Sequence, residues 1–209
     1  MKVYIDNQIL EFNNDKSGIE KILNEIEKEV TKTSKVLNSL IIDDYEIFSD
    51  YYDYFLDNIR VIEKVEVVLL TYKELVNETL SSTLDYLKRT PELIENLANS
   101  FYKSSCHKSW SDLDALLEGI TWLVESFSTI DSNRNLNDVI SDYKSWNLYS
   151  RDIISLSEIL PDFEDALSNR DNIIIADILS YEIQPKFNTM VDNLSKLVNM
   201  EEGMLNDLN

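Results

Sequence analysis

The chain contains one cysteine and one histidine, Cys106 and His107, and they are neighbours in the stretch SSCHKSW. A thiolate–imidazole pair could carry out nucleophilic catalysis, and two nearby lysines could favour the thiolate. Such a pair needs the two side chains in hydrogen-bond contact. Neighbouring side chains point about 100° apart on a helix and to opposite faces on a strand. We therefore predict no catalytic dyad, and interpret residues 104–110 as a connection between two helices, with Ser109 or Ser111 as the cap.

Other catalytic and cofactor sites lack the residues that they need. A zinc site requires several Cys and His ligands, and a di-iron bundle requires two Glu-x-x-His pairs. Ser-His-Asp catalysis would have to use His107, and no Gly-x-Ser-x-Gly motif accompanies any serine. The three isolated glycines, Gly18, Gly119 and Gly203, cannot form a phosphate-binding loop. The sequence therefore predicts no catalytic residue, no cofactor and a protein that is not an enzyme.

One polar stretch, DSNRNLNDVISD, has the spacing of a calcium-binding loop. Asp131, Asn133 and Asn135 occupy the first three ligand positions, and Asp142 stands where a bidentate Glu belongs. Leu136, however, replaces the glycine that makes the sharp turn, and the final aspartate is one carbon shorter than glutamate. A polar connection between helices accounts for the same residues, with calcium as the alternative.

Three carboxylates, Asp50, Asp53 and Asp57, recur at spacings of three and four residues. On a helix they would share one face and could receive a basic partner. A charged row of this kind is also typical of a solvated helix face. We therefore keep these three residues as candidates for partner binding.

The three tryptophans could anchor an interface, because tryptophan is enriched at binding hot spots. Their helical spacing fits core packing equally well. Trp122 lies among Ile120, Leu123 and Val124, so we predict that it belongs to the core.

The composition limits the classes of partner. The 209 residues include 39 Asp plus Glu and 19 Lys plus Arg, a net charge of −20. Binding nucleic acid needs clustered cations, and the same negative charge would be repelled by an anionic membrane surface. A basic protein partner is electrostatically favoured. The chain shows no signal peptide and no apolar stretch that could span a bilayer, and one cysteine allows no intrachain disulfide, so we expect a cytoplasmic protein.

The first 72 residues alternate in the way that strands require. A two-residue turn at Asp6-Asn7 pairs Ile5 with Gln8 and Val3 with Leu10, which puts apolar side chains on one face. A helix then follows, with Ser17 and Glu20 as a capping box. Later elements are listed in chain order: a strand ending near Ile42, a turn at Asp43-Asp44, a short strand Tyr45 to Ile47, a short helix in SDYYDYFLDNI, and a central strand in EKVEVVLLT.

This order of hairpin, helix, strand, short strand, short helix and central strand resembles the ubiquitin-like β-grasp fold over residues 1–72. The resemblance implies a mixed sheet in which EKVEVVLLT is parallel to the first strand, with the helix across one face. Conjugated modifiers and sulfur carriers of this fold end in a free Gly-Gly. Here Leu70-Thr71-Tyr72 continues into YKELVNETL, so the resemblance does not extend to those functions.

From Tyr72 onward, apolar residues recur at helical spacing. Thr90 and Pro91 predict the cap and first turn of a second helix, and Ser111 predicts the start of a third. A fourth pattern runs from Leu136 to Leu160.

Pro161 is expected to end that fourth helix, and a final pattern from about Asn172 is interrupted by Pro185. Residues 73–209 therefore predict an acidic bundle of about five or six helices. The predicted fold class is α+β, with a β-grasp-like domain at 1–72 and the helical bundle at 73–209.

Three functions are compatible with these features. The first is a protein-interaction module that acts as an adaptor, a chaperone-like protein or a regulatory partner. The second is an acidic inhibitor, resembling an antitoxin, that blocks a basic enzyme. The third is a small-ligand sensor or an enzyme with a pocket in the helical bundle, which would require two carboxylates in unlike environments within one cleft.

Overall fold

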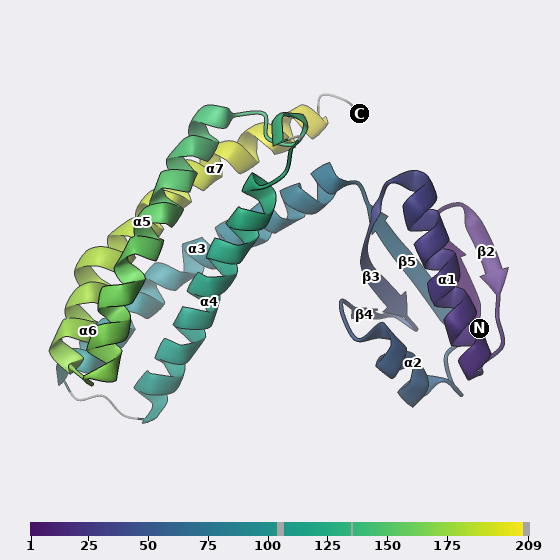
Figure 1. Cartoon of the computed structure of the whole chain (residues 1–209), viewed down its shortest axis with the longest axis horizontal. Coiled ribbons are helices and arrows are strands. Elements are labelled where there is room, and N and C mark those ends of the chain that lie inside the picture. Colours follow the sequence, from purple (N-terminus) through teal and green to yellow (C-terminus); the bar gives the residue numbers. More distant parts are fainter. Residues whose placement is uncertain (104–106, 135, 207–209) are drawn as a thin grey trace. The chain divides into compact units, whose positions relative to one another are not determined.

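The computed structural model describes residues 1–103, 107–134 and 136–206, with side chains up to residue 198 (Figure 1). The chain divides into two compact units, Met1–Leu75 and Val76–Asn209. The first unit contains a mixed five-stranded sheet and the second is helical. The predicted α+β fold class is therefore confirmed.

The sheet of the first unit has the strand order β2-β1-β5-β3-β4. Its strands are β1 (Lys2–Ile5), β2 (Gln8–Glu11), β3 (Val36–Ile42), β4 (Tyr45–Ile47) and β5 (Lys64–Leu70). β5 runs parallel to β1 and antiparallel to β3, while the pairs β1–β2 and β3–β4 are antiparallel hairpins. The sheet is therefore mixed, and the strand that comes last in the chain is central.

Both hairpins have the register that the sequence predicts. Ile5 pairs with Gln8, and Ile42 pairs with Tyr45. Asp6, Asp43 and Asp44 have positive φ angles of 51°, 45° and 69°, which aspartate tolerates better than most residues in tight turns. The chain therefore reverses at the predicted positions.

The carboxylate of Asp43 joins its turn to the central strand. Its Oδ1 atom accepts hydrogen bonds from the backbone N–H groups of Glu63 (3.1 Å) and Lys64 (2.8 Å). The backbone N–H of Asp43 in turn donates to the carbonyl oxygen of Lys64 (3.0 Å). This aspartate therefore has a structural role at the start of β5.

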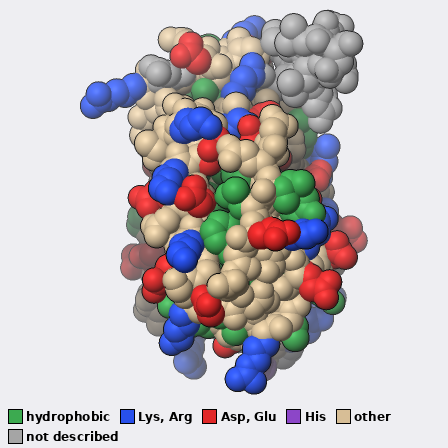
Figure 2. All heavy atoms as spheres, turned by 90° about the vertical axis from the view of Figure 1, so that its right-hand side faces the viewer, with side chains coloured by type: hydrophobic (Ala, Val, Ile, Leu, Met, Phe, Trp, Pro, Cys, Tyr) green, Lys and Arg blue, Asp and Glu red, His purple; other side chains and the backbone are tan. Residues whose placement is uncertain are grey.

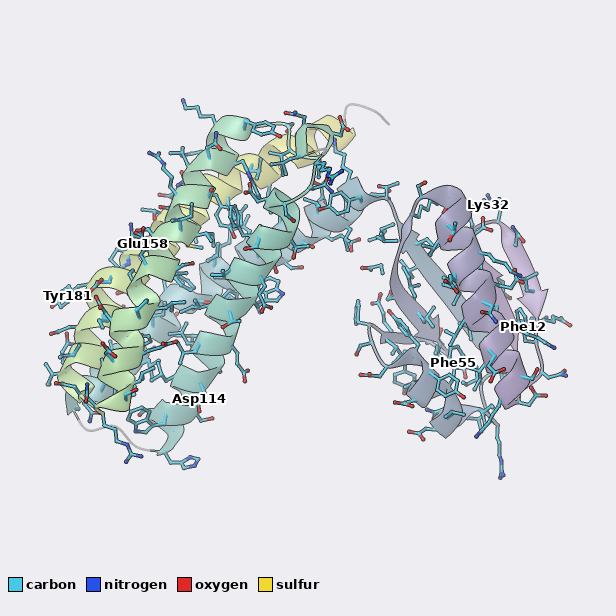
Figure 3. All side chains as sticks on the ribbon, in the orientation of Figure 1. Phe12, Lys32, Phe55, Asp114, Glu158 and Tyr181 are labelled. Carbon is cyan, nitrogen blue, oxygen red and sulfur yellow. The ribbon has the colours of Figure 1, made fainter. Side chains whose placement is uncertain are left out.

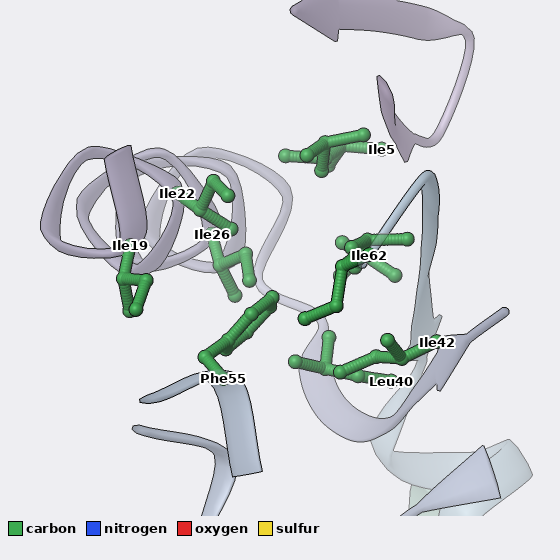
Figure 4. Packing of buried hydrophobic residues seen from close by; sticks show 11 residues of the cluster. Ile5, Ile19, Ile22, Ile26, Leu40, Ile42, Phe55 and Ile62 are labelled. Carbon is green, nitrogen blue, oxygen red and sulfur yellow. The ribbon is translucent and has the colours of Figure 1, made fainter. Parts of the chain in front are cut away.

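Two helices, α1 (Lys16–Thr33) and α2 (Tyr51–Asn58), contribute to the core of this unit. Figure 4 shows Ile22 and Ile26 of α1 and Phe55 of α2 directed toward the isoleucines and leucine of the sheet. The buried cluster consists of Val3, Ile5, Ile19, Ile22, Ile26, Leu40, Ile42, Phe55, Ile62, Val65 and Val67. These side chains alternate along the strands and recur every three or four residues on α1, because one face of each element is removed from water.

The helix α1 begins earlier than its sequence signals indicate. The N-cap is Asp15, whose Oδ1 accepts a hydrogen bond from the backbone N–H of Gly18 (2.7 Å). The predicted capping box of Ser17 and Glu20 is therefore wrong, because both residues lie inside the helix. Aspartate satisfies the same orphan N–H groups as serine does.

The second unit consists of five α-helices in its described part, with two short irregular helical segments. The α-helices are α3 (Tyr72–Lys103, which enters this unit at Val76), α4 (His107–Asp131), α5 (Tyr143–Ser168), α6 (Asn172–Ile178) and α7 (Gln184–Asn206). A 3-10 turn, η1 (Leu136–Asp138), precedes α5, and a π-helical segment, η2 (Leu179–Ile183), joins α6 to α7. In this unit α5 packs against α4, α6 and α7.

The helix α3 continues through Thr90 and Pro91, so the predicted start of a new helix at these residues is wrong. Proline removes one backbone hydrogen bond and costs a helix interior about 3 kcal/mol relative to alanine. Thr90 Oγ1 donates to the carbonyl oxygen of Tyr86 (2.6 Å), and Gln184 Nε2 donates to that of Pro91 (3.2 Å). The apolar stripe of α3 stays buried on both sides of the proline. Tertiary packing therefore outweighs the local cost.

The predicted bounds of the fourth helix are also wrong. α5 begins at Tyr143 instead of Leu136, and it passes through Pro161 to Ser168. Asp142 caps its first turn, because Oδ1 accepts from the backbone N–H groups at positions 144 and 145 (3.0 and 3.2 Å). Pro185 is the second residue of α7 and directly follows the π-helical segment η2, so it lies within helical residues that continue from α6 through η2 into α7.

Aromatic side chains from α4 and α5 form part of the core of the second unit. Trp146 stacks on Phe127 with ring centroids 5.2 Å apart, and Tyr149 contacts both rings. The indole Nε1 of Trp146 donates to Asp131 Oδ1 (2.9 Å). Trp146 can therefore be buried without leaving its one polar atom, the indole nitrogen, without a hydrogen-bond partner.

Candidate functional site

Trp122 lies at the surface of α4, which corrects the prediction that it belongs to the core. Its side chain is 39% exposed. The ring of Tyr86 on α3 contacts the indole edge-on, with centroids 6.1 Å apart and an interplanar angle of 76°. The prediction followed from the helical spacing, which puts Trp122 next to buried residues. Trp122 lies at the edge of the buried stripe of α4, and the exposed fraction of a side chain there depends on how α3 packs against it.

The contact between Tyr86 of α3 and the helix α4 depends on Gly119. A Cβ atom at this position would lie 2.5 Å from Cζ of Tyr86 and still nearer to its hydroxyl oxygen. The absence of a side chain at Gly119 therefore leaves the space in which the Tyr86 ring sits. That ring also packs against Phe187 of α7, with centroids 6.3 Å apart.

A hollow of about 560 Å³, here named the α4 hollow, lies beside Trp122. It is lined by Asp114, Leu117, Glu118, Thr121, Trp122 and Glu125. These residues are three or four positions apart, so they share one face of the helix. Three of the six are acidic and none is basic, and Figure 3 labels Asp114 on this helix.

The carboxylates of the α4 hollow have no ion-pair partner among the described residues. Glu118 and Glu125 stand one turn before and one turn after Trp122. An indole attracts a cation with about 0.5–2 kcal/mol, depending on desolvation. Carboxylates at both sides add a Coulomb attraction that salt weakens. The arrangement can therefore hold a Lys or Arg side chain.

The face seen in Figure 2 differs from this hollow in its pattern of charge. On the face seen in Figure 2, Lys and Arg side chains are interspersed with Asp and Glu side chains. Although the chain has a net charge of −20, acidic side chains do not cover that face uniformly. The α4 hollow, in contrast, has three acidic side chains in its lining and no basic one.

The predicted acidic row lies at α2 in the first unit. Asp50 is the N-cap position, with φ 53° and no capping bond from its side chain, and Ser49 Oγ donates to its Oδ2 (3.0 Å). Asp53 and Asp57 lie on the helix, and all three aspartates are exposed. Because Asp50 precedes the first helical turn, only the other two share a helix face. The partner-binding prediction for these residues stays a prediction.

The residues of the calcium-loop alternative have other roles in the structure. Asp131 accepts the indole hydrogen bond of Trp146, and Asp142 caps α5. Asn133 lies between α4 and η1, and Asn135 lies outside the described residues. Within the described part of the chain, no group of three or more His, Cys, Asp or Glu side chains could hold a metal ion.

The stretch that contains the cysteine and histidine is only partly described. Cys106 lies outside the described residues, and His107 is the exposed first residue of α4. Ser109 and Ser111 lie inside α4, so the prediction that one of them caps this helix is wrong. The helix begins four residues before Ser111.

Tyr102 of α3 is joined to α6 by a short hydrogen bond. Its hydroxyl donates to Asp177 Oδ1 (2.5 Å), and this bond, together with desolvation, raises the pKa of Tyr102 to about 12. Burial likewise raises the pKa of Tyr149 far above its ordinary value of 10.0. Both tyrosines are therefore neutral at physiological pH, and neither is prepared to act as a base.

The described chain is an α+β protein in which a unit with a mixed sheet precedes a helical unit. It belongs to the family described as "Domain of unknown function (DUF8042)", whose model matches residues 78–193, more than half of the chain. Residues 1–71 match the model described as "TP0873 N-terminal domain". Searches of curated proteins and of solved structures found no match. Among the described helices, none has the length and apolar character needed to cross a membrane.

Proposed function

We propose that the chain is a cytoplasmic protein-interaction module, without enzymatic activity, that binds a basic segment of a partner protein at the α4 hollow. The single observation that carries the proposal is the exposed indole of Trp122 in a lining that is half acidic and contains no cation. Lysine and arginine side chains match both features, because they are attracted by carboxylates and by aromatic rings.

The first unit supports the same class of function. We propose that it is a β-grasp module, supported by the order β2-β1-β5-β3-β4 and by the parallel pairing of β5 with β1. Exposed aromatic side chains, including Phe48 at 63% and Tyr52 at 39%, lie near the acidic positions Asp50 and Asp53. Aromatic side chains left in water beside carboxylates favour a role in binding over a role in stability.

The proposal is tested with the full chain and a fluorescein-labelled peptide of nine arginines, by fluorescence anisotropy at several salt concentrations. We expect Trp122→Ala to weaken binding about tenfold, which is the loss of about 1.4 kcal/mol of cation–π and contact energy. Trp122→Phe should retain part of the affinity. Glu118→Gln should weaken binding most at low salt, because it removes one charge from the hollow.

The matched control is Glu158→Gln, an identical charge change at an exposed residue of α5, which is labelled in Figure 3. It should leave peptide affinity unchanged within twofold. Equal weakening by Glu118→Gln and Glu158→Gln would mean that only the net charge attracts the peptide. Unchanged affinity in Trp122→Ala would exclude the α4 hollow as the site. Salt-insensitive binding would also contradict the proposal, including its variant in which the chain is an acidic inhibitor of a basic enzyme.

A further inference from the structure

A second concave surface of the helical unit lies between α3 and α4 and differs in chemistry from the α4 hollow. This groove has a volume of about 670 Å³. The side chains that α3 contributes recur every three or four residues from Tyr86 to Ser100, and those of α4 recur from Lys108 to Leu116. The volume falls within the range of about 300–1,000 Å³ that is usual for small-molecule sites.

The groove exists because bulky residues separate the two helices at both of its ends. At one end the Tyr86 ring sits over Gly119. At the other end Phe101 and Trp110 meet edge-to-face, with centroids 5.1 Å apart. Between these ends, α4 contributes the small side chain of Ala115, which cannot fill the gap. The space is therefore a consequence of where large and small residues fall on the facing helices.

Apolar side chains form a continuous part of the groove lining. Leu97 and Leu116 are buried at its base, with 6% and 7% exposure, whereas Leu93 is 64% exposed. An exposed leucine above a base of buried leucines gives an apolar ligand a surface on which to lose water. The hydroxyl groups of Ser100 and Ser109, which are hydrogen-bonded to each other, add polar atoms to the same groove.

Two opposite charges stand one helical turn apart along the groove. Lys108 and Asp112 both line it, and neither has an ion-pair partner among the described residues. At this spacing their Cβ atoms are about 5–6 Å apart. A ligand with an anionic end and a cationic end can therefore meet both side chains at once.

The charge of the whole chain decides between ligand classes. With a net charge of −20, the protein repels a ligand that is only anionic, even where a single lysine attracts it. A zwitterion has no net charge and avoids this repulsion. The two charged groups of such a ligand must be about as far apart as Lys108 and Asp112, which are one helical turn apart. Two extended residues span about 7 Å, so a dipeptide is long enough, whereas a single amino acid is shorter.

We propose that the groove between α3 and α4 binds an apolar dipeptide with free ends, its carboxylate at Lys108, its ammonium group at Asp112 and its side chains against Leu93, Leu97 and Leu116. The site is separate from the α4 hollow, which recognises a cation alone. It assigns a second ligand, of a different chemical class, to the helical unit.

The test is titration of the full chain with L-leucyl-L-leucine, followed by isothermal calorimetry and by amide shifts in NMR spectra. The N-acetylated peptide and the C-terminal amide each lack one end charge, and each should bind about tenfold more weakly than the free dipeptide. Asp112→Asn should abolish the difference between the free and the N-acetylated peptide, and Lys108→Gln the difference between the free peptide and its amide.

Ala115→Leu should eliminate binding, because the larger side chain fills the groove. Ala115 is exposed, so the substitution should have little effect on folding. Asp162→Asn is the matched control, since it makes the same charge change at an exposed residue of α5 that lines neither this groove nor the α4 hollow, and it should leave dipeptide affinity unchanged.

Three outcomes would overturn the proposal. The first two are the absence of any amide shift at millimolar dipeptide and equal affinity for the free peptide and the peptide capped at both ends. Neither result changes the outcome of the arginine-peptide assay at the α4 hollow, so one proposal can be wrong while the other holds. Retained binding in Ala115→Leu would likewise exclude the groove as the location of a dipeptide site.

Discussion

Replacement of Gly119 by alanine tests whether the ring of Tyr86 on α3 occupies the space over this glycine of α4. In an open helix, Gly→Ala stabilises by about 1 kcal/mol through helix propensity. Here the new Cβ would lie 2.5 Å from Tyr86 Cζ, where an ordinary contact is at least 3.4 Å, so the ring has to move. Moving it weakens the edge-to-face contacts with Trp122 and Phe187, each of which contributes about 0.5–1.5 kcal/mol. We expect the free energy of unfolding to fall by about 1–2 kcal/mol.

Urea unfolding monitored by tryptophan fluorescence measures this change selectively. All three tryptophans, at positions 110, 122 and 146, belong to the second unit, so the signal reports that unit alone. Ser111→Ala, at an exposed position of the same helix, is the control and should be neutral or slightly stabilising.

A double-mutant cycle supplies the decisive result. In a Tyr86→Ala background the ring is gone, and Gly119→Ala should then stabilise the unit by about 1 kcal/mol. If Gly119→Ala also stabilises the unit when Tyr86 is present, the ring does not occupy the space over the glycine and the packing described above is wrong.

Two further predictions concern helix caps. Asp15→Ala should lower the free energy of unfolding of the first unit by about 1 kcal/mol, whereas Ser17→Ala should have little effect, as measured by urea unfolding followed by circular dichroism; the reverse order would restore the predicted capping box. Hydrogen bonds from Ser145 hold the pKa of Asp142 below its ordinary value of 3.8, so the carboxylate stabilises the fold above that pH and loses this contribution as the pH falls through the lowered pKa. Asp142→Asn should therefore reduce the pH dependence of stability in acid titrations below about pH 4, and an unchanged acid slope would contradict the assignment.

The first unit was largely predictable from sequence because its signals are local. The turn at Asp6 and the turn at Asp43-Asp44 stand at positions where aspartate accepts a positive φ, and alternation then sets the register of each hairpin. The resemblance to the β-grasp fold further implied the parallel pairing of β5 with β1. A cap at Asp15 was missed because Ser17 and Glu20 presented a stronger pattern, although an aspartate before an apolar periodic stretch is also a capping signal.

The helical unit was predictable in class but not in its boundaries. Pro91 and Pro161 each carry a local cost that predicts a helix end, yet α3 and α5 continue through them. The compensation comes from tertiary packing, because the apolar stripe of α3 stays buried on both sides of Pro91. A single sequence shows the local cost and not the long-range contact that offsets it.

Both candidate sites depend on tertiary structure for the same reason. The sequence by itself determined that the chain is acidic, that it carries one histidine and one cysteine side by side, and that its apolar residues suit a mixed sheet followed by helices. Only the packing of α3 against α4 leaves Trp122 partly exposed and Lys108 and Asp112 beside an unfilled groove. Periodicity tells which face of a helix avoids water, whereas the fit of one helix against another decides which side chains at the margin of that face remain free to bind.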